Sequence, residues 1–400
     1  MATTGTGLCV LVGIGSLLMG CSFPVTERYP RWGEEIELTA GAAPTLSLRI
    51  LSPPRRPEAC LLILHGMNEY VGRYGDIARH FSRRFLVAGV DLRAHGLSNP
   101  VLARADAALA QGKASFDARW AFLEQASLRN LDPLRSDLDR ALRYLADRCD
   151  HERNGDRPLP LFILSHSLGS LVAATYLLEH GTGTAVQVKG IVLVGPAFSV
   201  PHVPGWRGWL QNPWIALSFF AEEHFLHDRG EPMPLFLLNQ LVALPTVALL
   251  NGLFEVFSWP GLRELFSPST PDWVPDSLTD DPQERARHRA DGYIIRRTVL
   301  RYVRGVEKEI VRFRRRMAEF SVPYLLISAA HDPITSAWGN RDFARLTRSR
   351  HGENEVVELA DYGYHEQMFS KPPLREILLR RIETWLDSRL DHLRAAPTPK

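Results

Sequence analysis

Along most of the chain, continuous apolar runs alternate with segments whose apolar positions recur every three or four residues. Runs such as 59–66 and 159–165 are apolar along nearly their whole length and are bounded by Pro, Gly or polar residues, which is typical of strands buried on both faces. Segment 133–148 instead places its leucines at helical spacing and predicts an amphipathic helix. The alternation predicts an α/β fold with a mainly parallel, doubly wound sheet. Strands are expected at 35–40, 46–51, 59–66, 85–92, 159–165, 189–198, 322–328 and 355–360, and helices at 73–84, 133–148, 170–180, 341–347 and 375–390.

Two segments interrupt this alternation. Residues 99–131 form a mostly helical excursion, and residues 200–290 form a longer one that is rich in Trp, Phe, Leu and Pro. We therefore expect residues 35–199 and 291–394 to build the two parts of one core, with 200–290 inserted between them as a helical cap.

The N-terminal pattern is that of an export signal. An apolar run at Leu8–Gly20 is shorter than the about 20 residues that a membrane-spanning helix needs. It ends in L-M-G-C, which resembles the lipobox of bacterial lipoproteins, so we expect residues 1–20 to be a signal peptide and Cys21 to be lipidated. Ser22 after the cysteine is typical of delivery to the outer membrane in Gram-negative bacteria, which predicts a cell-envelope protein facing the periplasm.

The first seven residues contain no Lys or Arg, which leaves an ordinary signal peptide or an uncleaved anchor as alternatives. Residues 21–34 are predicted to form a lipidated linker. Of the other cysteines, Cys60 and Cys149 would remain after processing. Export permits them to pair without requiring it, and the apolar strand around Cys60 favours a buried free thiol.

The net charge argues against nucleic acid as a partner. The 47 basic and 45 acidic residues nearly cancel, which leaves a net charge of +2 and gives no reason to expect nucleic acid binding. No metal or organic cofactor is implied either.

The apolar run 159–165 stops abruptly in Ser-His-Ser-Leu-Gly, and a helix is predicted directly after it. Ser167 therefore lies in a strand-to-helix turn with the spacing of a nucleophile elbow, whose tightness demands small residues two positions before and after. Those residues are Ser165, where Gly is usual, and Gly169. The alternative is that these residues are small only because the strand and the helix pack closely at this turn.

A serine hydroxyl needs a general base, and the expected chain order in such a fold is Ser, acid, His. Asp332 follows the strand at 322–328, and His365 follows the strand at 355–360. We predict a catalytic triad of Ser167, Asp332 and His365 at one edge of the sheet. His331 is the competing histidine, but it would leave no acid in the right order.

An oxyanion hole would complete the chemistry. Its expected donors are the backbone N–H of Leu168, directly after the nucleophile, and the N–H of Met67 in the loop 65–69.

With these residues in view, the chain resembles the monoacylglycerol lipase and lysophospholipase group of α/β-hydrolases, which is related to the serine aminopeptidases. The stretches "LHGMNEYVGRYGDIARHF" and "VAGVDLRAHGLSNP" match the group's patterns H-G-x-x-E-H-x-x-R-Y and D-x-x-G-H-G-x-S. Tyr70 stands where the group often has His, Ala94 where it often has Gly, and Ser165 where the elbow has Gly. The resemblance implies an acyl-enzyme mechanism and a cap over the site.

The cap segment is dense in aromatic side chains, namely Trp206, Trp209, Trp214, Phe219, Phe220, Phe225 and Phe236. They suit a lid over an acyl pocket, since burying each methylene contributes about 0.8 kcal/mol. Two other interpretations stay open: the aromatics pack the cap onto the core, or they enter a lipid interface. Two histidines, His224 and His227, form a possible metal pair without further ligands. The arginine run, Arg312 with Arg314–Arg316, predicts a solvated helix face or a site for anionic head groups.

The sequence therefore predicts a lipid-anchored serine hydrolase that cleaves the ester of a single-acyl lipid, a monoacylglycerol or lysophospholipid. The alternatives are a small-ester hydrolase or a peptidase of the same fold, and a non-catalytic envelope lipoprotein. The expected partners are a lipid or small-ester substrate and the membrane surface.

Overall fold

The computed structural model describes residues 24–113, 116–118, 120–152, 158–180, 186–199, 249, 252–253, 255–267, 269–270 and 274–395. An eight-stranded sheet forms the centre, with strand order β10-β9-β8-β7-β4-β5-β3-β2. Neighbours from β5 through β10 are parallel, and β2 and β3 are added antiparallel at one edge. The predicted mainly parallel sheet is thus confirmed. Its strands are β2 (Glu34–Ala40), β3 (Ala43–Leu51), β4 (Cys60–Leu64), β5 (Leu86–Val90), β7 (Leu161–His166), β8 (Val188–Val194), β9 (Tyr324–Ala329) and β10 (Glu355–Leu359).

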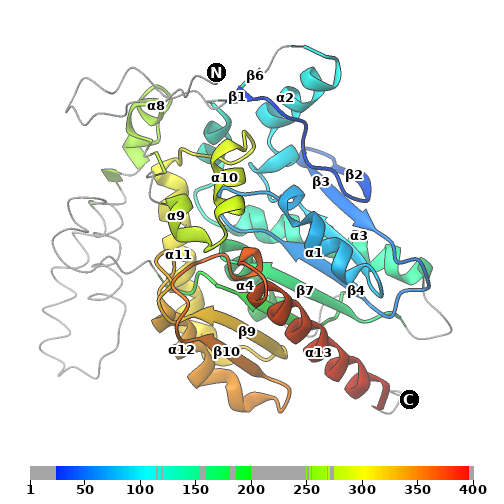
Figure 1. Cartoon of the computed structure of the whole chain (residues 1–400). Coiled ribbons are helices and arrows are strands. Elements are labelled where there is room, and N and C mark those ends of the chain that lie inside the picture. The colour runs from blue at the N-terminus through cyan, green and yellow to red at the C-terminus, as the bar shows by residue number, and fades with distance from the viewer. Residues whose placement is uncertain are drawn as a thin grey trace, which may run out of the picture.

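Helices cover both faces of this sheet (Figure 1). On one face, α3 (Asp132–Glu152), α4 (Leu168–His180), α11 (Leu300–Arg316) and α12 (Ala337–Thr347) contribute to one apolar core. On the other, α1 (Gly75–Phe81) and α13 (Leu374–Ala395) enclose a second core around Phe81, Ile382 and Trp385. Because both faces are covered, β4, β5 and β7 are buried along their whole length, as their continuous apolar runs predicted. Among the helices the structure describes, none is long and apolar enough to cross a bilayer.

The segment predicted as a linker instead packs onto the core. We call residues 24–33 the N-terminal strap. Its strand β1 (Pro24–Val25) pairs antiparallel with β6 (Phe116–Asp117), and Val25, Tyr29 and Trp32 are buried. The prediction of a linker over 21–34 is therefore wrong for its described part, because three apolar side chains of this short segment find places in the core.

The two excursions differ in how much of them is described. Within 99–131 lie α2 (Pro100–Ala110), β6 and a 3₁₀ segment at Ala121–Ser127, so this excursion is mostly helical, as expected. The described part of 200–290 carries α8 (Leu262–Phe266), α9 (Val274–Leu278) and α10 (Pro282–Ala290). The seven aromatic residues singled out in the cap, together with residues 1–23, lie outside the described residues.

Cys60 and Cys149 form a disulfide between the start of β4 and the end of α3, with their Cα atoms 6.4 Å apart. The expectation of a buried free thiol at Cys60 is therefore wrong. The apolar surroundings of Cys60 suit a thiol and a disulfide equally well, and the sequence does not reveal that α3 brings Cys149 to this strand.

Candidate active site

Ser167 lies in the turn between β7 and α4, with a positive backbone φ of 49°. This left-handed conformation is costly for a non-glycine residue and is a feature of strained functional turns. A Cβ on Gly169 would lie only 2.5 Å from the backbone oxygen of His65, which explains the need for Gly there. Ser165 replaces the usual glycine. Its buried hydroxyl has a hydrogen-bond partner, because its Oγ donates to the backbone oxygen of Val192 at 3.0 Å.

Ser167, His365 and Asp332 form one hydrogen-bonded chain. The Ser167 Oγ lies 2.8 Å from Nε2 of His365, and Nδ1 of His365 lies 2.8 Å from Oδ2 of Asp332. With Nδ1–H donated to the carboxylate, Nε2 is left as the acceptor for the serine hydroxyl. Burial alone would lower the pKa of His365, but the adjacent Asp332 charge raises it above its ordinary value of 6.5. The geometry therefore matches that of a nucleophile, a base and an orienting acid.

Asp332 is held as a carboxylate in the loop after β9. It accepts hydrogen bonds from the backbone N–H of Ile334 at 2.8 Å, and from the N–H and hydroxyl of Thr335 at 2.9 and 3.1 Å. Burial would raise the pKa of Asp332, but His365 and these donors hold it below its ordinary value. The competing His331 is exposed, and the hydrogen-bonded chain runs through His365 instead.

The loop that carries His365 is supported from the cap side. The backbone N–H groups of His365 and Glu366 donate to the backbone oxygens of Ser277 and Leu278, at 3.2 and 2.6 Å. Both acceptors belong to α9, so the described end of the cap segment fixes the position of the histidine.

The two backbone donors predicted for the oxyanion hole lie on segments that meet beside Ser167. Leu168 is the first residue of α4, so its N–H has no acceptor within the helix. On the other side, a Cβ built on Gly66 would lie 3.0 Å from the Ser167 Cβ, which puts the loop that carries Met67 next to the nucleophile. Asn68 turns this loop with a φ of 63°.

A buried ionic network that sequence reasoning missed lies beside the hydrogen-bonded chain. One carboxylate oxygen of Glu69 accepts from the Gly66 N–H at 2.6 Å and from His166 Nδ1 at 2.8 Å, and its other oxygen contacts Arg73 at 2.6 Å. Arg73 also makes a bidentate pair with Glu366, at 2.8 Å for each contact. The network thus joins the loop 65–69, the residue before Ser167 and the residue after His365.

The charges of this network are stabilised by one another. Burial by itself would raise the pKa of both glutamates, but His166 and Arg73 hold the pKa of Glu69 well below its ordinary value, and Arg73 holds that of Glu366 below it. A paired, hydrogen-bonded arrangement is what allows buried charges to persist. The available sequence signals were the four-residue spacing of Glu69 and Arg73 and the position of Glu366 directly after His365.

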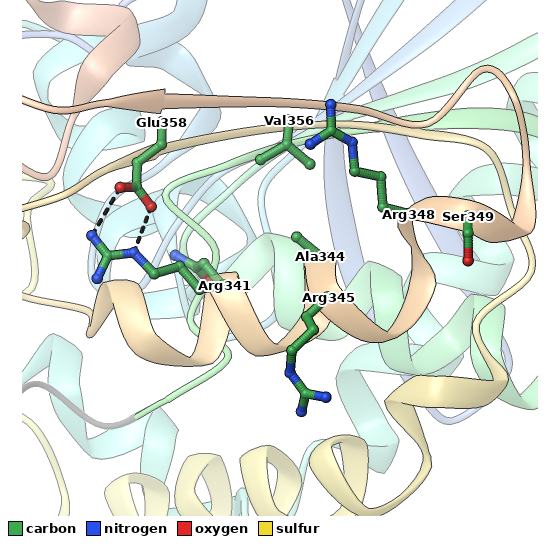
Figure 2. A pocket seen from close by; sticks show the side chains of 8 residues that line it. Arg341, Ala344, Arg345, Arg348, Ser349, Val356 and Glu358 are labelled. Carbon is green, nitrogen blue, oxygen red and sulfur yellow. Dashed lines mark hydrogen bonds and ion pairs between the residues drawn. The ribbon is translucent and has the colours of Figure 1, made fainter.

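A hollow lies on the outer surface, and residues other than these line it. It has a volume of about 400 Å³ and lies between α12 and β10 (Figure 2). Its lining consists of Asn340, Arg341, Ala344, Arg345, Arg348, Ser349, Val356 and Glu358. Arg341 makes a bidentate pair with Glu358 there, at 2.7 and 2.8 Å. Since Ser167 and His365 are not among the lining residues, this hollow is separate from the candidate site.

Within the described ranges, no group of three or more His, Cys, Asp or Glu side chains is placed to hold a metal ion. The sequence pair His224 and His227 lies outside those ranges. Of the arginines predicted as a solvated face, Arg312 and Arg316 pair with neighbouring acidic groups such as Glu179 and Glu319.

Comparisons with solved structures support this architecture. The fold is similar to a soluble variant of monoglyceride lipase from Saccharomyces cerevisiae, with a TM-score of 0.62, 14% identity, and coverage of 92% of this chain and 99% of that chain. It is also similar to a thermostable carboxyl esterase from Bacillus coagulans (TM-score 0.55, 18% identity, 89% and 98% covered) and to the monoacylglycerol lipase of Paleococcus ferrophilus (0.54, 19%, 86% and 99%). These likenesses establish the predicted α/β-hydrolase fold.

Two sequence comparisons bear on the family. An uncharacterised abhydrolase domain-containing protein from Dictyostelium discoideum is 27% identical over 164 residues, which span 40% of this chain but only 14% of that protein. The family model described as "Serine aminopeptidase, S33" matches residues 55–371, from just before β4 to just past the His365 loop. Because this match covers most of the chain and includes every element of the site, the protein belongs to the serine aminopeptidase S33 family of α/β-hydrolases.

Proposed function

We propose that this protein is a serine hydrolase that cleaves the carboxylic ester of a single-acyl lipid. The observation that carries the proposal is the chain of two 2.8 Å hydrogen bonds from Ser167 through His365 to Asp332. This chain supports the roles of a nucleophilic hydroxyl, a base and an orienting carboxylate, in the order that acyl transfer requires.

The reaction has two halves. His365 Nε2 takes the hydroxyl proton while Ser167 Oγ attacks the ester carbonyl, and the resulting imidazolium is stabilised by Asp332. Collapse of the tetrahedral intermediate breaks the bond to the alcohol, which leaves with the proton from His365. Water then attacks the acyl-enzyme while His365 takes a proton from it. His365 returns this proton to the oxygen of Ser167, which releases the fatty acid and restores the serine.

The oxyanion of each tetrahedral intermediate would be held by the N–H groups of Leu168 and Met67. Removal of one such donor typically costs about 2.7–4 kcal/mol of transition-state stabilisation. Glu69 contributes indirectly, because it accepts the Gly66 N–H at 2.6 Å and so fixes the backbone directly before Met67.

The choice between an ester and a peptide with a free amino terminus as the substrate rests on charge. An aminopeptidase must recognise the ammonium group of its substrate, which requires a carboxylate that is available to it. In the described part of the site, the carboxylates of Glu69 and Glu366 are both paired with Arg73, and Asp332 is paired with His365. This arrangement favours an uncharged ester group over a free amino terminus.

A lipid substrate and an envelope location are supported by the sequence. The apolar cap segment suits an acyl chain, and the lipobox-like end at Cys21 would keep the enzyme on a membrane. The Cys60–Cys149 disulfide is consistent with an oxidising compartment such as the periplasm. We therefore propose a lipid-anchored envelope enzyme that acts on monoacylglycerols or lysophospholipids.

A substrate series tests the proposal. We would assay the soluble chain from Ser22 with p-nitrophenyl esters of two to sixteen carbons, with a monoacylglycerol, a lysophospholipid and an aminoacyl amide. Ser167→Ala is the inactive comparison, and Ser349→Ala, in the outer hollow, is the matched control.

The expected result is hydrolysis that peaks at medium or long chains, disappears with Ser167→Ala and is unchanged with Ser349→Ala. Activity confined to the acetate would favour a small-ester hydrolase, and activity confined to the amide would favour a peptidase. A folded protein with no activity would favour the non-catalytic lipoprotein.

A further inference from the structure

The N-terminal strap crosses the same end of the sheet at which Ser167 lies. Tyr29 of the strap donates its hydroxyl to Asp91 at 2.9 Å, and its ring centroid lies 5.1 Å from that of Tyr70. Asp91 directly follows β5, and Tyr70 follows the loop after β4. Since β4, β5 and β7 are parallel neighbours, the strap and the nucleophile share the carboxyl edge of the sheet.

This position of the strap is fixed by charge as well as by packing. Asp106 in α2 accepts hydrogen bonds from Arg28 at 3.0 and 3.1 Å and from Arg31 at 2.5 Å. It also accepts the Tyr29 N–H at 2.9 Å and the Tyr293 hydroxyl at 2.9 Å. Both arginines of the strap thus pair with one buried carboxylate of α2, which fixes the position of the strap from Pro24 onward.

The distance from the start of the strap to the proposed anchor is short. Pro24, the first residue of the strap, follows Cys21 by only three positions. An extended chain spans at most about 3.5 Å per residue, or about 10 Å here. A lipid on Cys21 would therefore hold the surface around β1 within about 10 Å of the bilayer.

Three exposed apolar side chains belong to segments near β1. We call Trp120, Trp259 and Leu265 the apolar rim; their exposed fractions are 37%, 53% and 41%. Trp120 lies three positions after β6, the partner strand of β1, and Leu265 belongs to α8. Figure 1 shows β1, β6, α2 and α8 together at the top of the molecule.

A chain of side-chain and backbone contacts connects the members of the rim. The ring centroids of Trp120 and Phe122 are 6.1 Å apart, and the Arg297 guanidinium lies 4.9 Å from the Phe122 centroid. Arg297 also donates to the backbone oxygen of Glu264 in α8 at 2.7 Å. Trp259 lies one turn before α8, with its backbone oxygen accepting the Arg263 N–H at 2.9 Å.

We propose that the apolar rim is a membrane-docking surface. The proposal rests on the lipid anchor proposed above for Cys21, which would hold the rim against the bilayer so that the carboxyl edge of the sheet faces the lipid. Two independent observations meet here: the exit point of the strap, and exposed Trp and Leu side chains of the kind that enter a lipid interface. The occupant is a phospholipid bilayer. The orientation would let a single-acyl lipid reach Ser167 from the membrane without crossing open water.

The first test measures where each face lies. In the processed, lipidated chain that we propose, Cys9 has left with residues 1–20, the lipid blocks the Cys21 thiol, and Cys60 and Cys149 are paired, so one introduced cysteine can be labelled uniquely. We would place an environment-sensitive fluorophore on Leu265→Cys or on Ser349→Cys, which lies in the hollow between α12 and β10, in vesicles of phosphatidylethanolamine and phosphatidylglycerol (3:1).

The label at 265 is expected to shift its emission to the blue and to be quenched by a lipid-borne quencher, while the label at 349 stays as in buffer. An aqueous signal at 265, or equal signals at both positions, would overturn the proposal.

The second test removes the anchor. For the chain from Ser22, the double change Trp259→Ser and Leu265→Ser should weaken vesicle binding by about tenfold or more, because two large apolar side chains no longer enter the lipid. The matched change, Trp338→Ser and Ile377→Ser, removes exposed apolar groups outside the rim and should alter binding less than about twofold.

Equal losses in the two double variants would refute the assignment of this surface. The circular dichroism spectrum serves as the fold control for all variants, and hydrolysis of a water-soluble ester is measured beside it. The hydrolysis assay separates this proposal from the proposed function, because an inactive protein could still dock through the rim, and an active one could fail to.

Discussion

The Cys60–Cys149 disulfide allows a quantitative prediction. The bond closes a loop with a sequence separation of 89 residues. This loop contains residues 65–69, β5 and α2, so opening the disulfide would give the unfolded chain much more conformational freedom. The chain-entropy relation for a loop of this length gives about 4.6 kcal/mol at 25 °C, and removal of a native disulfide typically costs 2–5 kcal/mol.

We therefore expect reduction to lower the free energy of unfolding of the soluble chain by about 3–4.5 kcal/mol. The assay is guanidinium unfolding followed by tryptophan fluorescence, with and without dithiothreitol. The variant with both Cys60→Ala and Cys149→Ala is the control: it should match the reduced protein and should not respond to the reductant.

A loss below about 1 kcal/mol, or an equal response of the double variant to dithiothreitol, would refute the reasoning. Titration of free thiols in the denatured, unreduced protein gives an independent check. It should find none in the chain from Ser22, because its two cysteines are paired.

Three further predictions concern the site. Activity toward a neutral ester should fall as the pH falls through the pKa of His365, since only the neutral imidazole accepts the serine proton; that pKa is raised, so the midpoint of the kcat/KM profile should lie above 6.5. Arg73→Met leaves two buried carboxylates without their partner and should cost about 3–5 kcal/mol of stability, whereas Arg345→Met, at an exposed pair with Asp342, should change it by less than about 1 kcal/mol. Gly169→Ala brings a Cβ against a backbone oxygen and should lower stability by about 1–3 kcal/mol together with activity, while Gly352→Ala, whose Cβ meets nothing within 4 Å, should leave activity unchanged.

Each of these predictions has a contradicting result. A pH profile with a midpoint below 6.5 would mean that His365 is not the base, or that Asp332 does not raise the pKa of His365. Equal urea midpoints for the two arginine variants would remove the argument for a costly buried network. Full activity of the Gly169 variant would show that the elbow is not tightly packed.

The buried strands were the most predictable part of the fold. Runs such as 59–66 and 159–165 cover β4 and β7 to within one or two residues at either end, because Gly, Pro and polar residues bound them. Helix starts were less predictable. The helix expected from 341 begins at Ala337, since the Ser336 side chain caps it by accepting the Trp338 N–H, a signal that periodicity does not contain.

The candidate site was predictable where local pattern and chain order coincide. Ser167, Asp332 and His365 each follow a strand of the parallel sheet, and such ends share one edge. The network around Arg73 was not, because its partner Glu366 lies 293 positions away. The strap was missed for the same reason: the polar segment around Tyr29 resembles a linker until Asp91 and Asp106 are brought to it by the fold.

The central claim is that Ser167 is an activated nucleophile. The most direct measurement is mass spectrometry of the folded soluble chain after treatment with a fluorophosphonate, beside Ser167→Ala and His365→Gln. The account predicts one covalent adduct, located on Ser167, that is absent from the first variant and forms far more slowly in the second. Absence of an adduct in the folded wild-type protein, or an adduct on another serine, would contradict it.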